Sequence, residues 1–223
     1  MKIIVAISKV DDGNMSNGLI KADKKIIENR TSFLANNKIN IHQTTKVAIA
    51  YNSENYCRYI EVFEKDKGKG MKYSNIDTAD ALITCEINHA LFLPIADCVG
   101  AVIYDPKRRI LMVSHLGRHS LEQNGGYESV KFMIDNYKCD PSNLLVWLTP
   151  APGPDVYPMY AFNNQSIKYV VFHQLQSAGI LKNNITDNPA DTSKDLDYFS
   201  HSEFLKGNQL DDGRFAIVAM MKN

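Results

Sequence analysis

Apolar and polar positions along the chain form short blocks that are typical of a protein rich in β-structure. Runs rich in Val and Ile predict strands at 3–7, 47–51, 59–63, 81–84, 91–95, 99–104, 110–114, 144–148 and 215–220. Apolar residues at helical spacing predict three amphipathic helices, within 26–34, 130–137 and 167–178. Because several strands lie between 47 and 114 with no room for helices, strict alternation of strand and helix fails. The pattern therefore predicts an α+β fold with mixed or antiparallel sheets.

The same pattern predicts a single domain over residues 1–223. The only polar, turn-rich stretch of note, Lys65 to Lys72, lies between predicted strands and is interpreted as a loop. A chain of 223 residues can bury a core without disulfide or metal staples.

Charge and cysteine content exclude several classes of function. The 25 Lys and Arg residues balance 25 Asp and Glu residues, so neither nucleic-acid binding nor attraction to an anionic membrane is indicated. The longest apolar run, Ala90 to Tyr104, is too short to span a bilayer. The apolar run at 3–7 is too short for a signal peptide, and we expect a cytoplasmic protein. The four cysteines form no C-x-x-C pair and are interpreted as free thiols.

The most informative stretch for chemistry is a predicted hairpin that carries a cysteine and a histidine. Two predicted strands flank the turn at 105–108. A four-residue loop there pairs Tyr104 with Arg109 and sets Cys98 opposite His115. A five-residue loop would move the partner of Cys98 to Leu116 and leave His115 on the diagonal. Opposed side chains share a face of a sheet, with Cβ atoms about 4.5–5.5 Å apart, so we expect the thiol and the imidazole to be neighbours.

Such a pair suits two kinds of chemistry. An imidazolium lowers the pKa of a neighbouring thiol, and the two side chains together also suit a soft metal such as zinc. The plain structural alternative is a small buried cysteine and a histidine with one hydrogen bond at a strand end. Arg118 and His119 follow Gly117 in a turn, where they either favour an anion beside the thiol or form a solvated loop.

Five segments resemble, in order, blocks of the YfiH-like laccase-domain family, also called multicopper polyphenol oxidase or purine nucleoside phosphorylase YfiH-like. They are ADALIT at 79–84, ADC at 96–98, YDP at 104–106, HLG at 115–117 and DGRFA at 212–216. Weaker similarities at 28–30, 149–157 and 199–201 extend the resemblance over nearly the whole chain. The resemblance implies a four-layer α/β/β/α sandwich with mixed sheets, which is also the fold of the deamidase domain of cytotoxic necrotizing factor toxins.

The resemblance further implies a metal site of two histidines and one cysteine. The family's cysteine falls on Cys98 and one histidine falls on His115. The other histidine of the family belongs to a Q-x-H-G block, and this chain has Gln43 or Thr45 at that position. His42 could serve as the third metal ligand only with a register slip, and His119 is the other candidate for this ligand. Zinc is the expected metal. Copper is less favoured, because six histidines without an H-x-H pair can hardly build a multicopper centre.

The activity that the resemblance implies is purine nucleoside chemistry, namely phosphorolysis, with adenosine deamination as a further reaction of the family. The substrates would be small molecules, a purine nucleoside and phosphate. The candidate catalytic residues are Cys98, His115 and Asp97, and the candidate substrate contacts are Arg118, His119, Asn29 and Arg30.

Two alternatives stay open. One is a metal-free hydrolase or deamidase with a Cys–His dyad. The other is a nucleoside-binding protein without catalysis, because the tryptophan and arginine expected after HLG are replaced by Arg118 and His119, and the arginines expected after 199–201 by Ser202 and Glu203. No oligomeric state is indicated.

Overall fold

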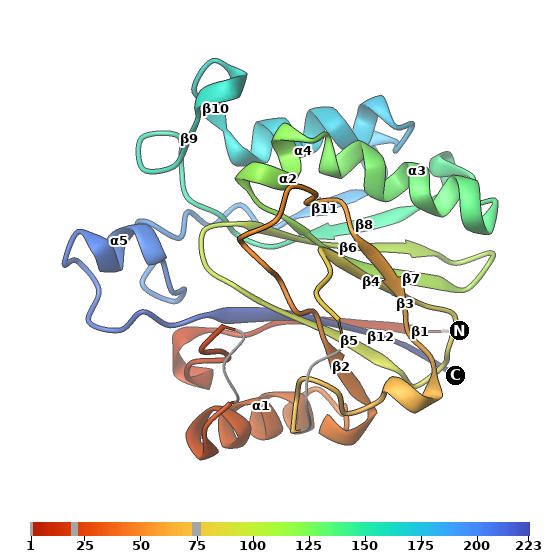
Figure 1. Cartoon of the computed structure of the whole chain (residues 1–223), viewed down its shortest axis with the longest axis horizontal. Coiled ribbons are helices and arrows are strands. Elements are labelled where there is room, and N and C mark those ends of the chain that lie inside the picture. The colour runs from red at the N-terminus through yellow and green to blue at the C-terminus, as the bar shows by residue number, and fades with distance from the viewer. Residues whose placement is uncertain (1, 19–21, 73–76) are drawn as a thin grey trace.

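Two β-sheets that face each other form the centre of the fold, and the computed structural model describes residues 2–18, 22–72 and 77–223 (Figure 1). The smaller sheet has the strand order β1-β12-β5-β2, with β1 (Lys2–Ile7), β2 (Thr44–Lys46), β5 (Ala90–Ile95) and β12 (Phe215–Lys222). The larger has the order β11-β8-β6-β7-β4-β3, with β3 (Tyr59–Glu61), β4 (Ala81–Thr84), β6 (Val99–Asp105), β7 (Ile110–Leu116), β8 (Leu145–Leu148) and β11 (Ile185–Asp187). Both sheets are mixed, because β2 runs parallel to β5, β3 to β4 and β11 to β8, while their other pairs are antiparallel.

Helices cover the outer face of each sheet (Figure 1). Helix α1 (Lys24–Asn36) lies on the smaller sheet, where Phe33 and Leu34 pack in one apolar cluster with Phe92. Helices α3 (Gly125–Tyr137) and α4 (Ile167–Ser177) lie on the larger sheet, where Val130 and Leu175 belong to a second cluster. A third cluster fills the space between the sheets. The expected four-layer α/β/β/α sandwich with mixed sheets is therefore confirmed.

The strands between these layers are buried on both faces. All residues of β5 are buried, and all of β12 except Lys222. This accounts for their nearly continuous apolar sequences, because a strand covered on both sides has no polar face to present.

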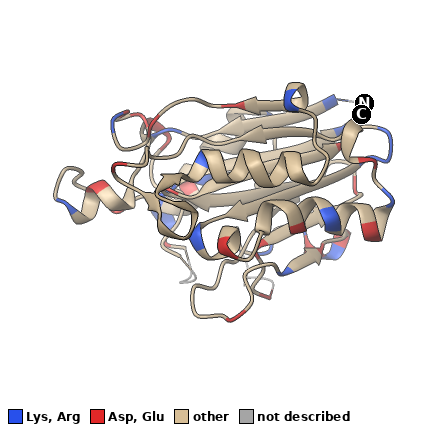
Figure 2. Ribbon diagram, turned by 90° about the horizontal axis from the view of Figure 1, so that it is seen from above, with Lys and Arg blue, Asp and Glu red and all other residues tan. Residues whose placement is uncertain are grey.

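Short elements complete the chain. They are α2 (Arg118–Glu122), α5 (His201–Leu205), the two-stranded ribbon β9 (Pro158–Met159) and β10 (Gln165–Ser166), and the 3-10 turns η1 (Val10–Asp12), η2 (Ile41–Gln43), η3 (Glu64–Asp66), η4 (Pro141–Asn143), η5 (Tyr160–Phe162) and η6 (Lys182–Asn184). Charged residues of both signs are spread over helices and loops and are sparse on the strands (Figure 2). Among the described residues, no helix is long and apolar enough to cross a membrane.

The strand predicted at 47–51 is wrong, because β2 ends at Lys46. Val47 N still donates to Phe92 O at 2.9 Å, and the next bond of this parallel ladder would need an N–H at Pro94. Proline has none, so regular pairing stops there. Residues 47–50 continue without strand structure and bring Tyr51 into contact with the His115 ring.

Candidate functional site

Cys98 lies in the tight connection between β5 and β6. The preceding residue, Asp97, has a φ of 68°, a left-handed conformation that aspartate tolerates better than most residues. The side chain of Cys98 makes a hydrogen bond with Tyr157, and burial raises the pKa of the thiol to about 12. The thiol is therefore protonated at neutral pH.

The predicted register of the β6–β7 hairpin is wrong by two positions. Tyr104 pairs with Leu111, and Gly100 lies opposite His115. The loop runs from Pro106 to Arg109, where Arg109 has a φ of 60°. A shift of two positions keeps every side chain on its own face of the sheet, so Cys98 still lies diagonally across from His115.

Gly117 shows how closely the thiol and the imidazole approach each other. A Cβ atom built on Gly117 would lie 3.0 Å from Cys98 Sγ, 3.0 Å from His115 Nε2 and 2.8 Å from His115 Cε1. Its φ of −93° is open to any residue, so glycine is required here for space and not for backbone conformation. The structure thus brings the two predicted residues together around one point.

His115 has an unusual environment for a polar side chain. It is 5% exposed, and neither ring nitrogen has a hydrogen-bond partner in the described part of the protein. Burial lowers its pKa to about 4, so the ring is neutral at pH 7. Buried polar atoms are nearly always hydrogen-bonded. Two unsatisfied nitrogens on one ring therefore make His115 a candidate ligand-binding residue.

Asp97 supports the site without lining it. Its carboxylate accepts hydrogen bonds from Ser200 Oγ, Ser202 N and Ser202 Oγ, each at 2.7 Å. Ser200 is also the N-cap of α5. These bonds fix the start of α5 against the β5–β6 connection, and they make Asp97 a positioning residue.

Two cavities meet at Cys98. The first, of about 390 Å³, is lined by Tyr51, Tyr56, Cys98, His115, Gly117, Arg118, His119, Ser120, Val156, Tyr157, His201, Ser202 and Leu205, and we call it the aromatic cavity. The second, of about 420 Å³, is lined by Ser16, Gly18, Lys46, Val47, Ala48, Ile49, Tyr51, Pro94, Cys98, Tyr157, His201 and Arg214, and we call it the basic cavity. Four residues, Tyr51, Cys98, Tyr157 and His201, line both.

Arg118 and His119 both reach the aromatic cavity. The guanidinium carbon of Arg118 lies 4.8 Å from the ring centre of Tyr157 and 5.2 Å from that of Tyr160, and its buried Nε has no hydrogen-bond partner among the described residues. His119 stacks on Tyr56, with ring centres 4.9 Å apart. The sequence left open whether these residues form a solvated loop, and the structure favours the site for Arg118.

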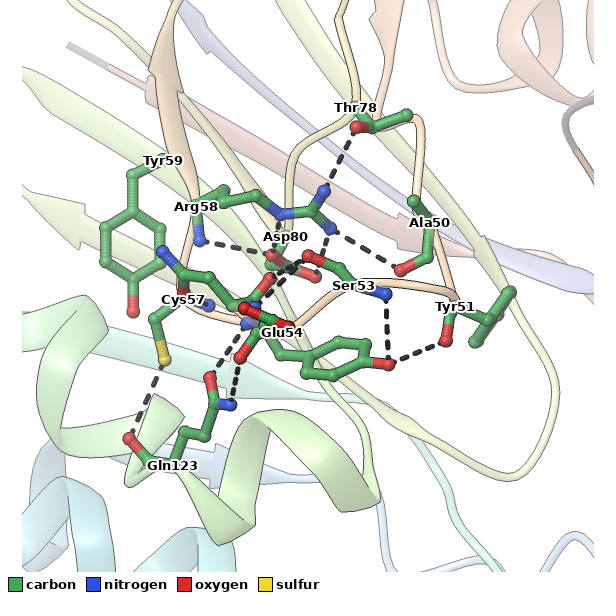
Figure 3. A network of polar contacts seen from close by, with 12 residues as sticks. Ala50, Tyr51, Ser53, Glu54, Cys57, Arg58, Tyr59, Thr78, Asp80 and Gln123 are labelled. Atoms are coloured by element: carbon green, nitrogen blue, oxygen red, sulfur yellow. Dashed lines mark hydrogen bonds and ion pairs between the residues drawn. The ribbon is translucent and has the colours of Figure 1, made fainter.

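A polar network holds the segment that carries Tyr51 and Tyr56 (Figure 3). The buried carboxylate of Asp80 accepts from Arg58 Nε at 2.9 Å and from Arg58 N at 3.1 Å. Tyr56 OH donates to Tyr51 O at 2.6 Å, and Tyr56 N donates to the side chain of Gln123 at 2.8 Å. The backbone of Asp80 also accepts from His115 N at 2.8 Å, so one network connects this wall of the aromatic cavity to β7.

The other predicted residues lie away from the cavities. Asn29 donates to Asn14 O at 2.9 Å, and Arg30 donates to the carbonyls of Met15, Gly70 and Met71. Both residues hold neighbouring loops, and neither is among the residues that line the two cavities. His42 lies in η2, just before β2, whose first residue pairs with Ala90 at the start of β5. Cys98 follows the other end of β5, so the structure does not bring His42 to Cys98 and His115.

Sequence reasoning missed several cavity residues, among them Lys46, Tyr51, His201 and Arg214. Lys46 carried a signal, because it is a lone lysine beside the apolar run 47–49, and it is 3% exposed. The only sequence signal for His201 and Arg214 is the resemblance of their segments to blocks of the family. Both contact Asp212, at 2.8 Å from His201 Nδ1 and at 2.6 Å from Arg214 Nη1.

The fold and the site define an α/β/β/α sandwich protein with a neighbouring Cys–His pair, whose cysteine lines two cavities. The family model described as multi-copper polyphenol oxidoreductase laccase matches residues 5–168, well over half of the chain, and the protein belongs to this family.

Known relatives agree with this assignment. The chain is 30% identical over 96 residues to the Bacillus subtilis protein named purine nucleoside phosphorylase YlmD, a match that spans 42% of this chain and 34% of that protein. This chain therefore aligns with only about a third of that relative's length. The fold matches a Bacillus licheniformis protein, hypothetical protein YfiH, with a TM-score of 0.86 and 19% identity over 99% of this chain and 93% of the other. It also matches YlmD from Geobacillus stearothermophilus, with a TM-score of 0.80 and 19% identity over 94% and 85% of the two chains.

Proposed function

We propose that the protein cleaves purine nucleosides with phosphate, at the wall where Cys98 and His115 lie. The observation that carries this proposal is the His115 ring, whose two nitrogens are buried and have no partner among the described residues. Leaving such groups unsatisfied costs free energy, which a bound ligand would recover. The name of the Bacillus subtilis relative supports a purine nucleoside as that ligand.

In phosphorolysis a phosphate oxygen forms a bond to C1′ of the ribose, while the bond from C1′ to N9 breaks and its electron pair moves into the purine ring. The departing ring needs its negative charge stabilised at N7. A neutral imidazole carries one N–H donor and one acceptor nitrogen. We assign the N–H of His115 to donate to N7 until the phosphate or solvent delivers the proton, which releases the free base and ribose 1-phosphate.

The aromatic cavity is the place we assign to the base. The stacked rings of Tyr56 and His119 offer an aromatic face. The guanidinium of Arg118 is held between Tyr157 and Tyr160, and its unsatisfied Nε–H is a donor for an acceptor on the purine. A largely apolar cavity with a few fixed polar groups is typical of small-molecule sites.

The residues present do not fit the metal site that the resemblance implies. Catalytic zinc takes three protein ligands, and Cys98 and His115 supply two donors of the right kind. No group of three His, Cys, Asp or Glu residues that could hold a metal lies together within residues 2–18, 22–72 and 77–223. We therefore derive no step through zinc or copper.

The two alternatives differ in how well the site supports them. A Cys–His nucleophile needs a thiolate beside an imidazolium. Burial acts in the opposite sense on both groups here, because it raises the pKa of Cys98 and lowers that of His115. The metal-free hydrolase or deamidase is therefore disfavoured. A nucleoside-binding protein without catalysis uses the same cavities and differs only in turnover.

Turnover of a small panel of nucleosides, with and without inorganic phosphate, tests the proposal. Inosine, guanosine and adenosine are incubated with the purified protein, and the products are separated by chromatography. We expect a free base to form only when phosphate is present. Base release without phosphate would indicate a hydrolase, conversion of adenosine to inosine would indicate deamination, and binding without any product would indicate the non-catalytic alternative. Zinc and copper are measured on the same sample by elemental analysis.

A further inference from the structure

Two cations near the basic cavity, Lys46 and Arg30, are buried and bonded to backbone carbonyls instead of to a carboxylate. Lys46 is 3% exposed, and its Nζ donates to Gly18 O at 3.1 Å. The guanidinium of Arg30, also buried, donates to the carbonyls of Met15, Gly70 and Met71. Burial, together with the positive charge of Arg30, lowers the pKa of Lys46 to about 8.

Lys168 shows the usual arrangement for a lysine of low exposure. Its side chain is 17% exposed and forms an ion pair with Asp187. Burying a charge without such a partner is costly, because the solvation lost is not replaced. No Asp or Glu is among the described residues that line the basic cavity, so the negative charge that would balance Lys46 is not supplied by its walls.

Arg214 adds a second cation to the same cavity. Its Nη1 donates to Asp212 Oδ1 at 2.6 Å and to Gly213 O at 2.8 Å, which fixes the guanidinium in place. The carboxylate of Asp212 also contacts His201 at 2.8 Å. One carboxylate is therefore shared by an arginine and a histidine, while Lys46 has no carboxylate partner among the residues that the structure describes.

We infer that the basic cavity binds a phosphate-class oxyanion through the ammonium group of Lys46 and the guanidinium group of Arg214. Both are donors that suit phosphate. Cys98 lies on the wall that this cavity shares with the aromatic cavity. An anion beside Lys46 and a nucleoside in the aromatic cavity would therefore meet at that wall. The identification of the anion as the free phosphate of the reaction rests on the function proposed above.

Binding of inorganic phosphate to the purified protein, without nucleoside, tests the site. Titration calorimetry and the phosphate-dependent shift in melting temperature are measured for the wild type, Lys46→Met and Lys168→Met. We expect phosphate to bind and stabilise the wild type, and to bind about tenfold or more weakly to Lys46→Met. In phosphate-free buffer Lys46→Met should melt no lower than the wild type, because an unbalanced buried charge is removed.

Lys168→Met is the matched control. It leaves Asp187 without its ion-pair partner, so its melting temperature should fall, while the stabilisation by phosphate should persist. Equal stabilisation of the wild type and Lys46→Met by phosphate, or none in either protein, would overturn the inference. Binding of inosine 5′-monophosphate that depends on Lys46, without binding of inorganic phosphate, would overturn the identification of the anion as free phosphate.

The same variants separate this inference from the proposed function. Phosphate binding that depends on Lys46, in a protein that leaves nucleosides intact, would support the anion site and refute phosphorolysis. Phosphorolysis with an unchanged KM for phosphate in Lys46→Met would support the proposed function and refute the anion site.

Discussion

Replacing Gly117 with alanine places one methyl group in the space between the thiol and the imidazole. The new carbon would lie 2.8 Å from His115 Cε1 and 3.0 Å from both Cys98 Sγ and His115 Nε2, well inside the usual contact of about 3.5–4.0 Å. The backbone at Gly117 is open to alanine, so the whole effect comes from crowding. Overpacking of a buried site costs about 1–3 kcal/mol, and a displacement of a reacting group by about 1 Å costs roughly 100-fold in rate.

The assay compares Gly117→Ala with Gly100→Ala, whose added methyl group lies nearest to core side chains. A Cβ on Gly100 would lie 2.9 Å from Ile217 Cγ2 and 3.2 Å from Ile95 Cδ1. Both variants should lose stability in urea denaturation by similar amounts. Only Gly117→Ala should lose phosphate-dependent release of the base from inosine, by about 100-fold. Equal activity in the two variants would refute the assignment of the Cys98 and His115 wall as the reacting site.

Asp97→Ala should lower the free energy of unfolding by about 3 kcal/mol in urea denaturation, because it leaves Ser200 and Ser202 without their acceptor. The free energy of unfolding of Asp97→Asn should lie between that of Asp97→Ala and that of the wild type. A wild-type value for Asp97→Ala would contradict the positioning role. Burial lowers the pKa of His89 from 6.5 to about 4, so the unfolded chain takes up the proton first when the pH falls. The contribution of the neutral His89 to the free energy of unfolding, roughly 3 kcal/mol, should be complete above pH 6.5 and be lost as the pH falls toward 4. The denaturation midpoints of His89→Gln should change less over this range. Arg118→Lys should raise KM for inosine about tenfold with little change in kcat, because an ammonium group cannot stack between Tyr157 and Tyr160 as the planar guanidinium does. An unchanged KM would show that Arg118 does not contact the base.

The sequence predicted the fold where apolar patterns are continuous. Strands such as β5 and β12 are buried on both faces and are easily recognised. The segment after Lys46 was mistaken for a strand, because its apolar residues are buried beside β5 but pairing stops at Pro94. The residue pattern alone indicates that such a segment is buried. It does not indicate which backbone hydrogen bonds the segment forms.

The candidate site was predictable where the hairpin determined it. The predicted register of the β6–β7 hairpin was wrong by two positions. The predicted face of each side chain was still correct, because an even shift preserves it. Cys98 and His115 are therefore still neighbours on one face of the sheet, although His115 lies opposite Gly100. Only the resemblance points to His42 and Arg30, and their positions in the fold depend on where β2 and α1 meet other elements. Lys46 and Arg214 come from distant parts of the chain, and their shared cavity is a property of tertiary structure.

In the proposed reaction, the neutral, unsatisfied ring of His115 assists the departure of a purine base. The most direct measurement is the rate of phosphate-dependent hypoxanthine release from inosine, for the wild type and for His115→Ala, with Cys85→Ser as a control at an exposed thiol. We predict that His115→Ala loses about 100-fold or more of the rate, while Cys85→Ser retains it. Phosphate-dependent release at the wild-type rate by a folded His115→Ala protein would contradict the claim.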